Sequence, residues 1–171
     1  MILKIYCDTN TLPANIRDEK ELEAIKELER RGMPMFGSHI VPYEAMNTKN
    51  EVKRKQLSNE HGALTPTPKD EKLPGFHTLT DRYSFFSWPM LSDVQDEAIR
   101  AELIARGLKL RDAEHITRAV CNECDVFLTR DIKTIIKPHK KCLEQRFPKL
   151  KVWLPSELLA YIQAAGVPSA M

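Results

Sequence analysis

The stretch Lys4–Asn10, KIYCDTN, decides the fold that we expect for this chain. Leu3 to Cys7 is typical of a short buried strand, and Asp8 follows it directly. A carboxylate at the end of a core strand is unfavourable unless a cation or hydrogen-bond donors compensate its charge. The segment therefore predicts an N-terminal strand that leads into a functional site.

Strand and helix patterns alternate along the rest of the chain. Further strands are predicted at Met35–Val41, Val126–Thr129 and Leu150–Leu154, and helices at Asp18–Arg31, Pro42–Leu57, Ser92–Gly107, Arg111–Glu123, Asp131–Arg146 and from Pro155 onward. Pro138 is expected to break or kink the fifth of these helices. The alternation predicts an α/β fold with a parallel sheet and helices on both faces.

Composition narrows the class of protein. The 171 residues predict one domain, 1–171, with an insertion-like proline-rich and aromatic segment around residues 62–91. The net charge of +2 neither requires nor excludes a nucleic-acid partner. No apolar run approaches the ~20 residues of a membrane span, and no signal-peptide pattern is present, so we expect a cytoplasmic protein without a membrane partner. The four cysteines are too few for a disulfide scaffold, and we expect reduced thiols.

Four carboxylates from distant parts of the chain fall near predicted strand ends or helix starts. Asp8 and Asp131 follow strands, Glu44 lies in the first turn after the second strand, and Asp112 opens a helix. Parallel sheets place their sites beyond the carboxyl ends of the strands, so these acids are expected to meet at one edge. Clustered oxygen ligands favour Mg²⁺ or Mn²⁺, which would activate a water for phosphodiester cleavage.

Each acid also has a purely structural alternative. Asp112 and Asp131 are good helix-capping residues, and Glu44 would complement a helix dipole. Asp8 is hardest to explain in this way. The four acids together favour a functional site more strongly than any one of them does.

Four segments resemble the motifs of a PIN domain in their usual order. They are KIYCDTNTL (residues 4–12), GSHIVPYEAMN (37–47), LRDAEHITRAV (110–120) and CDVFLTRD (124–131). The resemblance implies a three-layer α/β/α sandwich and a ribonuclease that depends on Mg²⁺ or Mn²⁺. The residues that match the family's metal-binding and catalytic acids are Asp8, Glu44, Asp112 and Asp131.

The same resemblance assigns supporting roles and partners. Asn10, Thr129, Ser38 and His115 match positions that support the acids. The implied substrate is RNA. Many small bacterial members are toxins neutralised by an antitoxin protein. Two protein partners therefore remain open for this chain: an antitoxin, and a second copy in a homodimer.

Local basic and aromatic residues are candidates for holding RNA. Arg130 adjoins Asp131, and the basic run on the predicted helix includes Lys53, Arg54 and Lys55. These side chains would contact phosphates. The alternative for the basic run is a solvated helix face, and the alternative for Arg130 is a salt bridge beside the acids. Phe85, Phe86 and Trp88 would stack on bases, or they belong to the core or to an oligomer contact.

Two other functions remain open at this stage. A non-catalytic PIN-like module would bind RNA or protein with the same surface. A phosphotransferase would use Asp8 as a nucleophile that forms an aspartyl-phosphate, although Asn10 stands where a second acid is expected.

Overall fold

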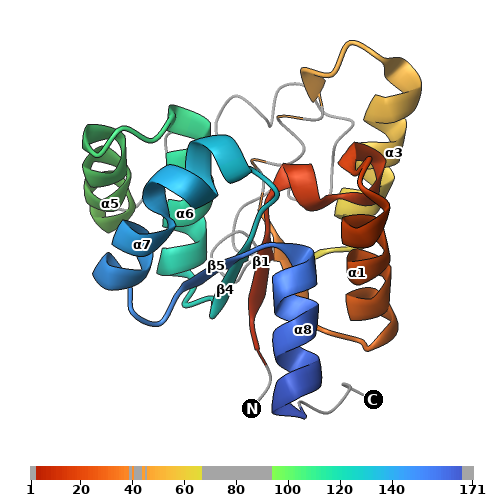
Figure 1. The fold of residues 1–171 in the computed structure, drawn as a ribbon. Coiled ribbons are helices and arrows are strands. Elements are labelled where there is room, and N and C mark those ends of the chain that lie inside the picture. The colour runs from red at the N-terminus through yellow and green to blue at the C-terminus, as the bar shows by residue number, and fades with distance from the viewer. Residues whose placement is uncertain (1–2, 39, 41–43, 45, 67–93, 167–171) are drawn as a thin grey trace.

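The computed structural model describes residues 3–38, 40, 44, 46–66 and 94–166 (Figure 1). Within these ranges the strands are β1 (Ile5–Cys7), β2 (Met35–Gly37), β3 (Thr65–Pro66), β4 (Val126–Leu128) and β5 (Lys151–Trp153). They form one sheet in the order β3-β2-β1-β4-β5, and every neighbouring pair is parallel. The predicted parallel α/β sheet is confirmed.

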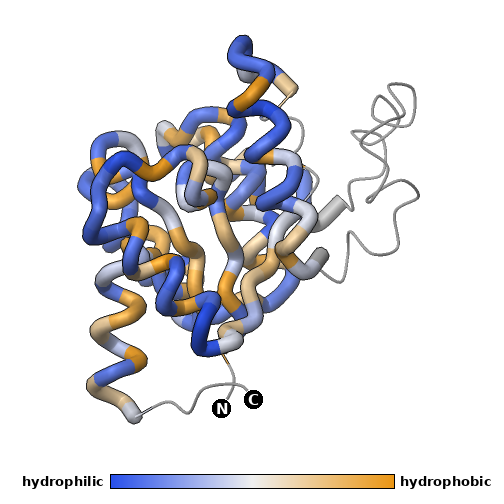
Figure 2. Tube along the Cα trace, turned by 90° about the vertical axis from the view of Figure 1, so that its right-hand side faces the viewer, coloured by the Kyte–Doolittle hydropathy of each residue, from blue (hydrophilic) through white to orange (hydrophobic). Residues whose placement is uncertain are grey.

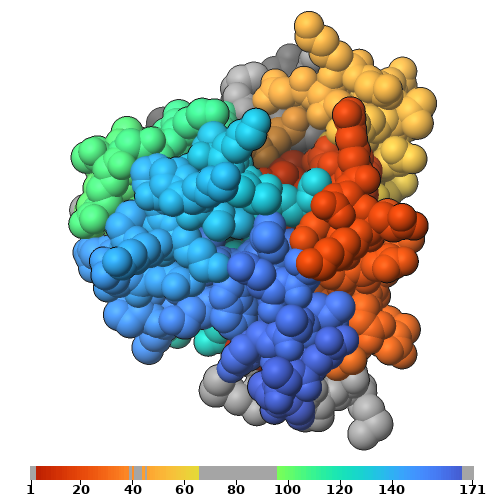
Figure 3. Space-filling model, viewed as in Figure 1, coloured from red at the N-terminus to blue at the C-terminus, as the bar shows by residue number. Residues whose placement is uncertain are grey.

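Helices cover both faces of this sheet. The described α-helices are α1 (Glu19–Arg30), α3 (Glu51–Gly62), α5 (Val94–Ala105), α6 (Leu110–Cys121), α7 (Lys137–Arg146) and α8 (Pro155–Ala165). Figure 1 shows α1 and α8 on one side of the strands and α5, α6 and α7 on the other, which confirms the three-layer sandwich. In Figure 3 the surfaces of α1 and α8 meet directly, although they come from opposite ends of the chain.

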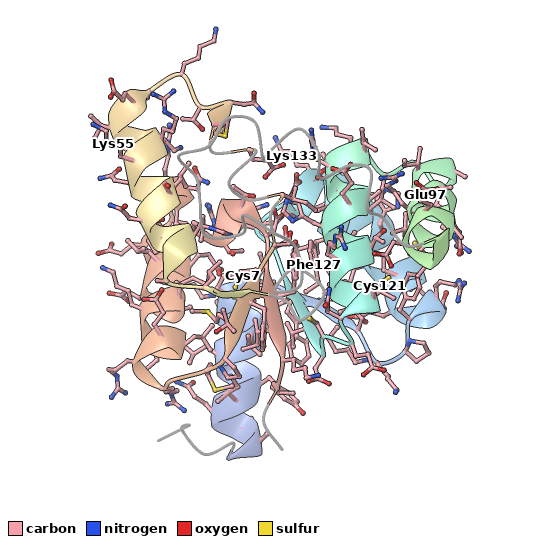
Figure 4. All side chains as sticks on the ribbon, turned by 180° about the vertical axis from the view of Figure 1, so that it is seen from behind. Cys7, Lys55, Glu97, Cys121, Phe127 and Lys133 are labelled. Carbon is pink, nitrogen blue, oxygen red and sulfur yellow. The ribbon has the colours of Figure 1, made fainter. Side chains whose placement is uncertain are left out.

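Alternating side chains divide the strands between two cores. Tyr6 and Phe127 point to one face, where they pack with Ile116 of α6. Their neighbours along the strands point to the other face, as Cys7 does, and pack with Leu28 of α1. Figure 4 shows Cys7 and Phe127 between the helical layers. Burial on both faces is what parallel strands require, and it explains why they are nearly continuous in apolar residues.

Hydrophobic residues concentrate in the interior segments, and the outer turns of the other helices are mainly hydrophilic, whereas α8 is largely apolar (Figure 2). None of the described helices is long and apolar enough to cross a membrane. The four cysteines are free thiols, in agreement with the prediction. Burial raises the pKa of Cys7 and of Cys124 to about 12, so both behave as small apolar side chains.

The strand order fixes where a ligand site can form. The chain builds β1, β2 and β3 outward in one direction, and then returns to place β4 on the other side of β1. The connections that follow β1 and β4 therefore diverge, and a parallel sheet is expected to bind ligands between the carboxyl ends of these two strands, a position that we call the crevice. Asp8 follows β1, and Thr129 follows β4.

Several predicted boundaries differ from the structure. The single helix predicted over Pro42–Leu57 is wrong, because the chain leaves the helical conformation near Asn47 and Asn50 then caps α3. Asn50 accepts a hydrogen bond from the Lys53 backbone N–H at 3.0 Å, and asparagine is a preferred capping residue. The second strand ends at Gly37, earlier than the predicted Val41.

Two further differences concern proline-containing segments. The predicted loop after Gly62 contributes the short strand β3 at the sheet edge, where proline is tolerated. The predicted helix over Asp131–Arg146 divides into a π-helix, η4 (Ile132–Ile136), and α7, with Pro138 in the first turn of α7. The predicted cap at Ser92 and most of the 62–91 segment lie outside the described residues.

A buried carboxylate joins the first helix to the last. Glu21 of α1 is buried and accepts hydrogen bonds from the Ser156 backbone N–H at 2.9 Å and from the Ser156 hydroxyl at 2.6 Å. Ser156 lies in the first turn of α8, where backbone N–H groups lack partners within the helix. The contact satisfies one of these groups and complements the positive end of the helix dipole.

We expect Glu21→Ala to lower the free energy of unfolding by about 2 kcal/mol, because it removes both hydrogen bonds from the partly buried Ser156 to a charged carboxylate. Urea denaturation monitored by circular dichroism measures the change. Glu23→Ala is the matched control, since Glu23 lies exposed on the same helix. Equal losses in the two variants would contradict this role for Glu21.

Candidate functional site

Asp8 lies buried at the carboxyl end of β1, held by polar neighbours. Its Oδ2 accepts hydrogen bonds from the Thr129 hydroxyl at 2.7 Å and from the Asn10 side-chain amide at 2.6 Å. The Asp8 backbone N–H donates to the Leu128 carbonyl at 3.0 Å, which continues the pairing of β1 with β4. These bonds use Oδ2 and leave Oδ1 directed elsewhere.

The other oxygen of Asp8 faces His115 and Glu44. Nε2 of His115 lies 3.7 Å from Asp8 Oδ1 and 3.3 Å from Glu44 Oε2. The Thr9 hydroxyl is 3.5 Å from the same nitrogen. His115 is buried, whereas the Glu44 side chain is 27% exposed, so Glu44 forms the solvent side of the group.

A buried hydroxyl pair lies behind His115. The Tyr6 hydroxyl is 2.9 Å from His115 Nδ1 and 2.6 Å from the Ser38 hydroxyl. Ser38 also accepts a 3.4 Å hydrogen bond from the Ile40 backbone N–H. The ring of His115 is thus fixed at both nitrogens, with Nε2 directed toward the carboxylates.

Asp112 and Asp131 form a second carboxylate pair that shares Thr134. The Thr134 hydroxyl is 2.5 Å from Asp131 Oδ2 and 3.4 Å from Asp112 Oδ2. Asp131 also caps η4, because its Oδ1 accepts from the Thr134 backbone N–H at 2.8 Å. Asp131 is therefore a helix cap, as the structural alternative predicted, and it also lies close to Asp112.

Charge interactions connect the two groups. Burial raises the pKa of Asp8 above its ordinary 3.8, and the charges of Glu44 and Asp112 raise it further. Burial also raises the pKa of Asp112, and Asp131 adds to the increase. Asp8 thus interacts with Glu44 and Asp112, and Asp131 adds to the group through Asp112; repulsion among these carboxylates favours a bound cation.

His115 compensates part of this negative charge. Burial acts to lower its pKa, but the hydrogen bond to Glu44 and the charges of Asp8 and Glu44 outweigh burial and raise it. Burial likewise acts to raise the pKa of Glu44, and His115 more than offsets this effect. A protonated imidazole is one way to balance the carboxylates, and a metal ion is another.

The donor geometry is compatible with a divalent metal ion. One atom each from Asp8, Glu44 and His115 lies within 4.8 Å of the other two. Two ligands bound to one ion at about 2.1 Å can be at most about 4.2 Å apart. The His115 distances of 3.3 Å and 3.7 Å fall within this limit, so small shifts would complete a site.

The predicted basic residues take different positions. Arg130 donates from its guanidinium to the backbone carbonyls of Asn10 and Asn15, both at 3.1 Å, and so holds the loop after β1. Lys53, Arg54 and Lys55 lie on α3, and Figure 4 shows Lys55 on the outer side of that helix. Phe85, Phe86 and Trp88 are outside the described residues.

Sequence reasoning missed three residues of this region. Tyr6 was assigned to the apolar strand, and Thr134 to the interior of a helix. Lys109 precedes α6 and is exposed, and its charge opposes the rise in the pKa of Asp112 that burial and Asp131 cause. Only Lys109 had a signal in the sequence, because it lies three residues before a predicted acid.

No family model matches this chain, and no curated protein matches it either. The PIN-domain resemblance therefore stays a prediction.

We expect Asp112→Asn to stabilise the metal-free protein at pH 7. Since folding raises the pKa of Asp112, the native state binds its proton more tightly than the unfolded chain. Stability therefore falls as pH rises above 3.8, and the substitution removes this loss. After discounting for solvent screening, we expect a gain of about 0.5 kcal/mol.

Chemical denaturation in a chelator, at pH 7 and well below the ordinary pKa of 3.8, measures this effect. The gain should vanish at the lower pH, where Asp112 is protonated in both states. Glu23→Gln, at an exposed position, should change stability little at either pH. A loss of stability at pH 7 in Asp112→Asn would contradict the repulsion.

Proposed function

We propose that this protein is a metal-dependent endoribonuclease that hydrolyses RNA phosphodiesters. The proposal is carried by one observation: carboxylates distant in sequence interact electrostatically at the topological switch point of a parallel sheet. This is where α/β proteins bind substrates. The PIN-domain resemblance of the same residues supplies the substrate class.

In this proposal, the protein holds the reacting groups in fixed positions. Asp8 and Glu44 would bind the metal, and Asp112 and Asp131 would be available for a second ion or for a metal-bound water. Thr129 orients Asp8 by occupying its other oxygen. The bound ion would lower the pKa of a water molecule and neutralise charge on the phosphate.

RNA would approach past the N-terminal turn of α6. Lys109 is exposed beside Asp112, so its ammonium group is positioned to pair with a phosphate. Leu110 is 52% exposed, and Ile132, which follows Asp131, is 43% exposed. Apolar side chains next to the acids offer contact surface for unpaired bases.

Asp8→Asn tests the catalytic proposal. We expect cleavage of single-stranded RNA in Mn²⁺ or Mg²⁺ to fall at least ~100-fold, because the carboxylate that binds the metal is lost. Circular dichroism should show an unchanged fold, since an amide oxygen still accepts from Thr129. A fluorescent RNA cleavage assay measures the rate.

The matched control is Asp125→Asn at the opposite end of the sheet, where Asp125 accepts a hydrogen bond from the Lys4 backbone N–H. This variant should cleave RNA at the wild-type rate. Binding of RNA without cleavage by the wild type would favour the non-catalytic module. A trapped phosphoenzyme would favour the phosphotransferase instead.

Lys109→Ala tests the approach of the RNA. We expect KM for RNA to rise about threefold to tenfold with little change in kcat, and the salt dependence of binding to weaken. Lys151→Ala is the control, because Lys151 is exposed at the start of β5, away from the acids. Equal KM values for the two variants would exclude a phosphate contact at Lys109.

A further inference from the structure

The donor set at the crevice includes a nitrogen atom. His115 presents Nε2 to the same space as Asp8 Oδ1 and Glu44 Oε2, at 3.7 Å and 3.3 Å. The sequence assigned His115 only a supporting role and predicted a site made of oxygen atoms. Asp112 and Asp131 are turned toward Thr134. His115 supplies a third donor atom, within 4.8 Å of one oxygen each of Asp8 and Glu44.

Hydrogen bonds behind the ring suit His115 to this task. When Nε2 carries the lone pair, Nδ1–H donates to the Tyr6 hydroxyl at 2.9 Å. The Tyr6 O–H then donates to the Ser38 hydroxyl at 2.6 Å, so both the Nδ1–H of His115 and the Tyr6 O–H have an acceptor. Histidine ligands in metal sites usually donate their second N–H in this manner, which fixes the tautomer and the orientation of the ring.

We propose that His115 is a direct metal ligand, oriented by Tyr6, and that its nitrogen makes the site select a divalent transition-metal ion over Mg²⁺. The inference rests on the metal site of the proposed function, and it does not depend on RNA cleavage. Mg²⁺ prefers oxygen ligands and gives up its waters reluctantly, whereas imidazole binds transition metals well. The site should bind Co²⁺ more tightly than Mn²⁺.

Mn²⁺ itself is the probe of the ligand set. Electron spin echo spectroscopy of the wild-type protein with one equivalent of Mn²⁺ should show ¹⁴N modulation from a coordinated imidazole. The signal should disappear in His115→Gln and remain in His61→Gln, which alters a buried histidine on α3. Mn²⁺ bound without nitrogen modulation in the wild type would overturn the inference.

Melting temperatures over titrations of Mn²⁺, Co²⁺ and Mg²⁺ measure selectivity, because a ligand that binds only the native state raises the melting temperature. We expect His115→Gln to weaken Mn²⁺ binding at least ~10-fold and Mg²⁺ binding less than about threefold. Equal affinity of the wild type for Mn²⁺ and Mg²⁺ would overturn the proposal. The wild-type measurements need no variant, so a misfolded His115→Gln protein would not prevent the test.

Tyr6→Phe tests the positioning role. We expect a ~10-fold loss of Mn²⁺ affinity with the ¹⁴N modulation retained, as is typical when the partner of a ligand is removed. The control is Tyr161→Phe, at an exposed tyrosine that packs against Trp153. If Tyr6 were only structural, the metal-free melting temperature would fall while the ratio of Mn²⁺ to Mg²⁺ affinity stayed unchanged, and the orienting role would be refuted.

The two proposals fail separately. Nitrogen coordination without RNA cleavage would leave the ligand assignment in place and refute the ribonuclease. RNA cleavage with a metal ion that has no nitrogen ligand would support the ribonuclease and refute His115 as a ligand.

Discussion

The burial of a negative charge at the end of β1 is the constraint on which the rest of the structure depends. Asp8 lies beside Glu44 and Asp112, and burial together with both charges makes its ionised form unfavourable. The fold offsets this with hydrogen-bond donors that follow β4 and β1, namely Thr129 and Asn10, and with the imidazole of His115. A charge retained at such a position is more simply explained by a ligand than by stability.

The sheet topology explains why these groups meet. Since β1 lies between β2 and β4, the segments that follow β1 and β4 extend over the same crevice from neighbouring strands. Helix α6 contributes Asp112 and His115 to the same position. Its apolar stripe, which includes Ala113 and Ile116, packs into the core, and this packing holds Asp112 and His115 at the crevice. One helix thus contributes to both the core and the site, because residues three apart share a helix face.

Two groups of acids with different surroundings divide the crevice. Asp8 is tied to rigid strand ends and is nearly inaccessible, whereas Asp112 and Asp131 share the hydroxyl of Thr134 near exposed Lys109. In the proposed function, the buried group would hold a cation in fixed geometry, and the outer group would contact the substrate. Capping of η4 by Asp131 shows that one carboxylate can serve local structure and the crevice together.

The sequence by itself determined the α/β class, the parallel sheet and the positions of Asp8 and Asp131 after strands, because apolar periodicity and strand ends are local properties. It misplaced the helix over Pro42–Leu57, since the break before Asn50 depends on a cap that the apolar pattern does not record. Only the tertiary structure decided that His115 faces Asp8 and that Tyr6 lies behind it. Those contacts join residues more than a hundred positions apart, so they arise from strand order and helix packing.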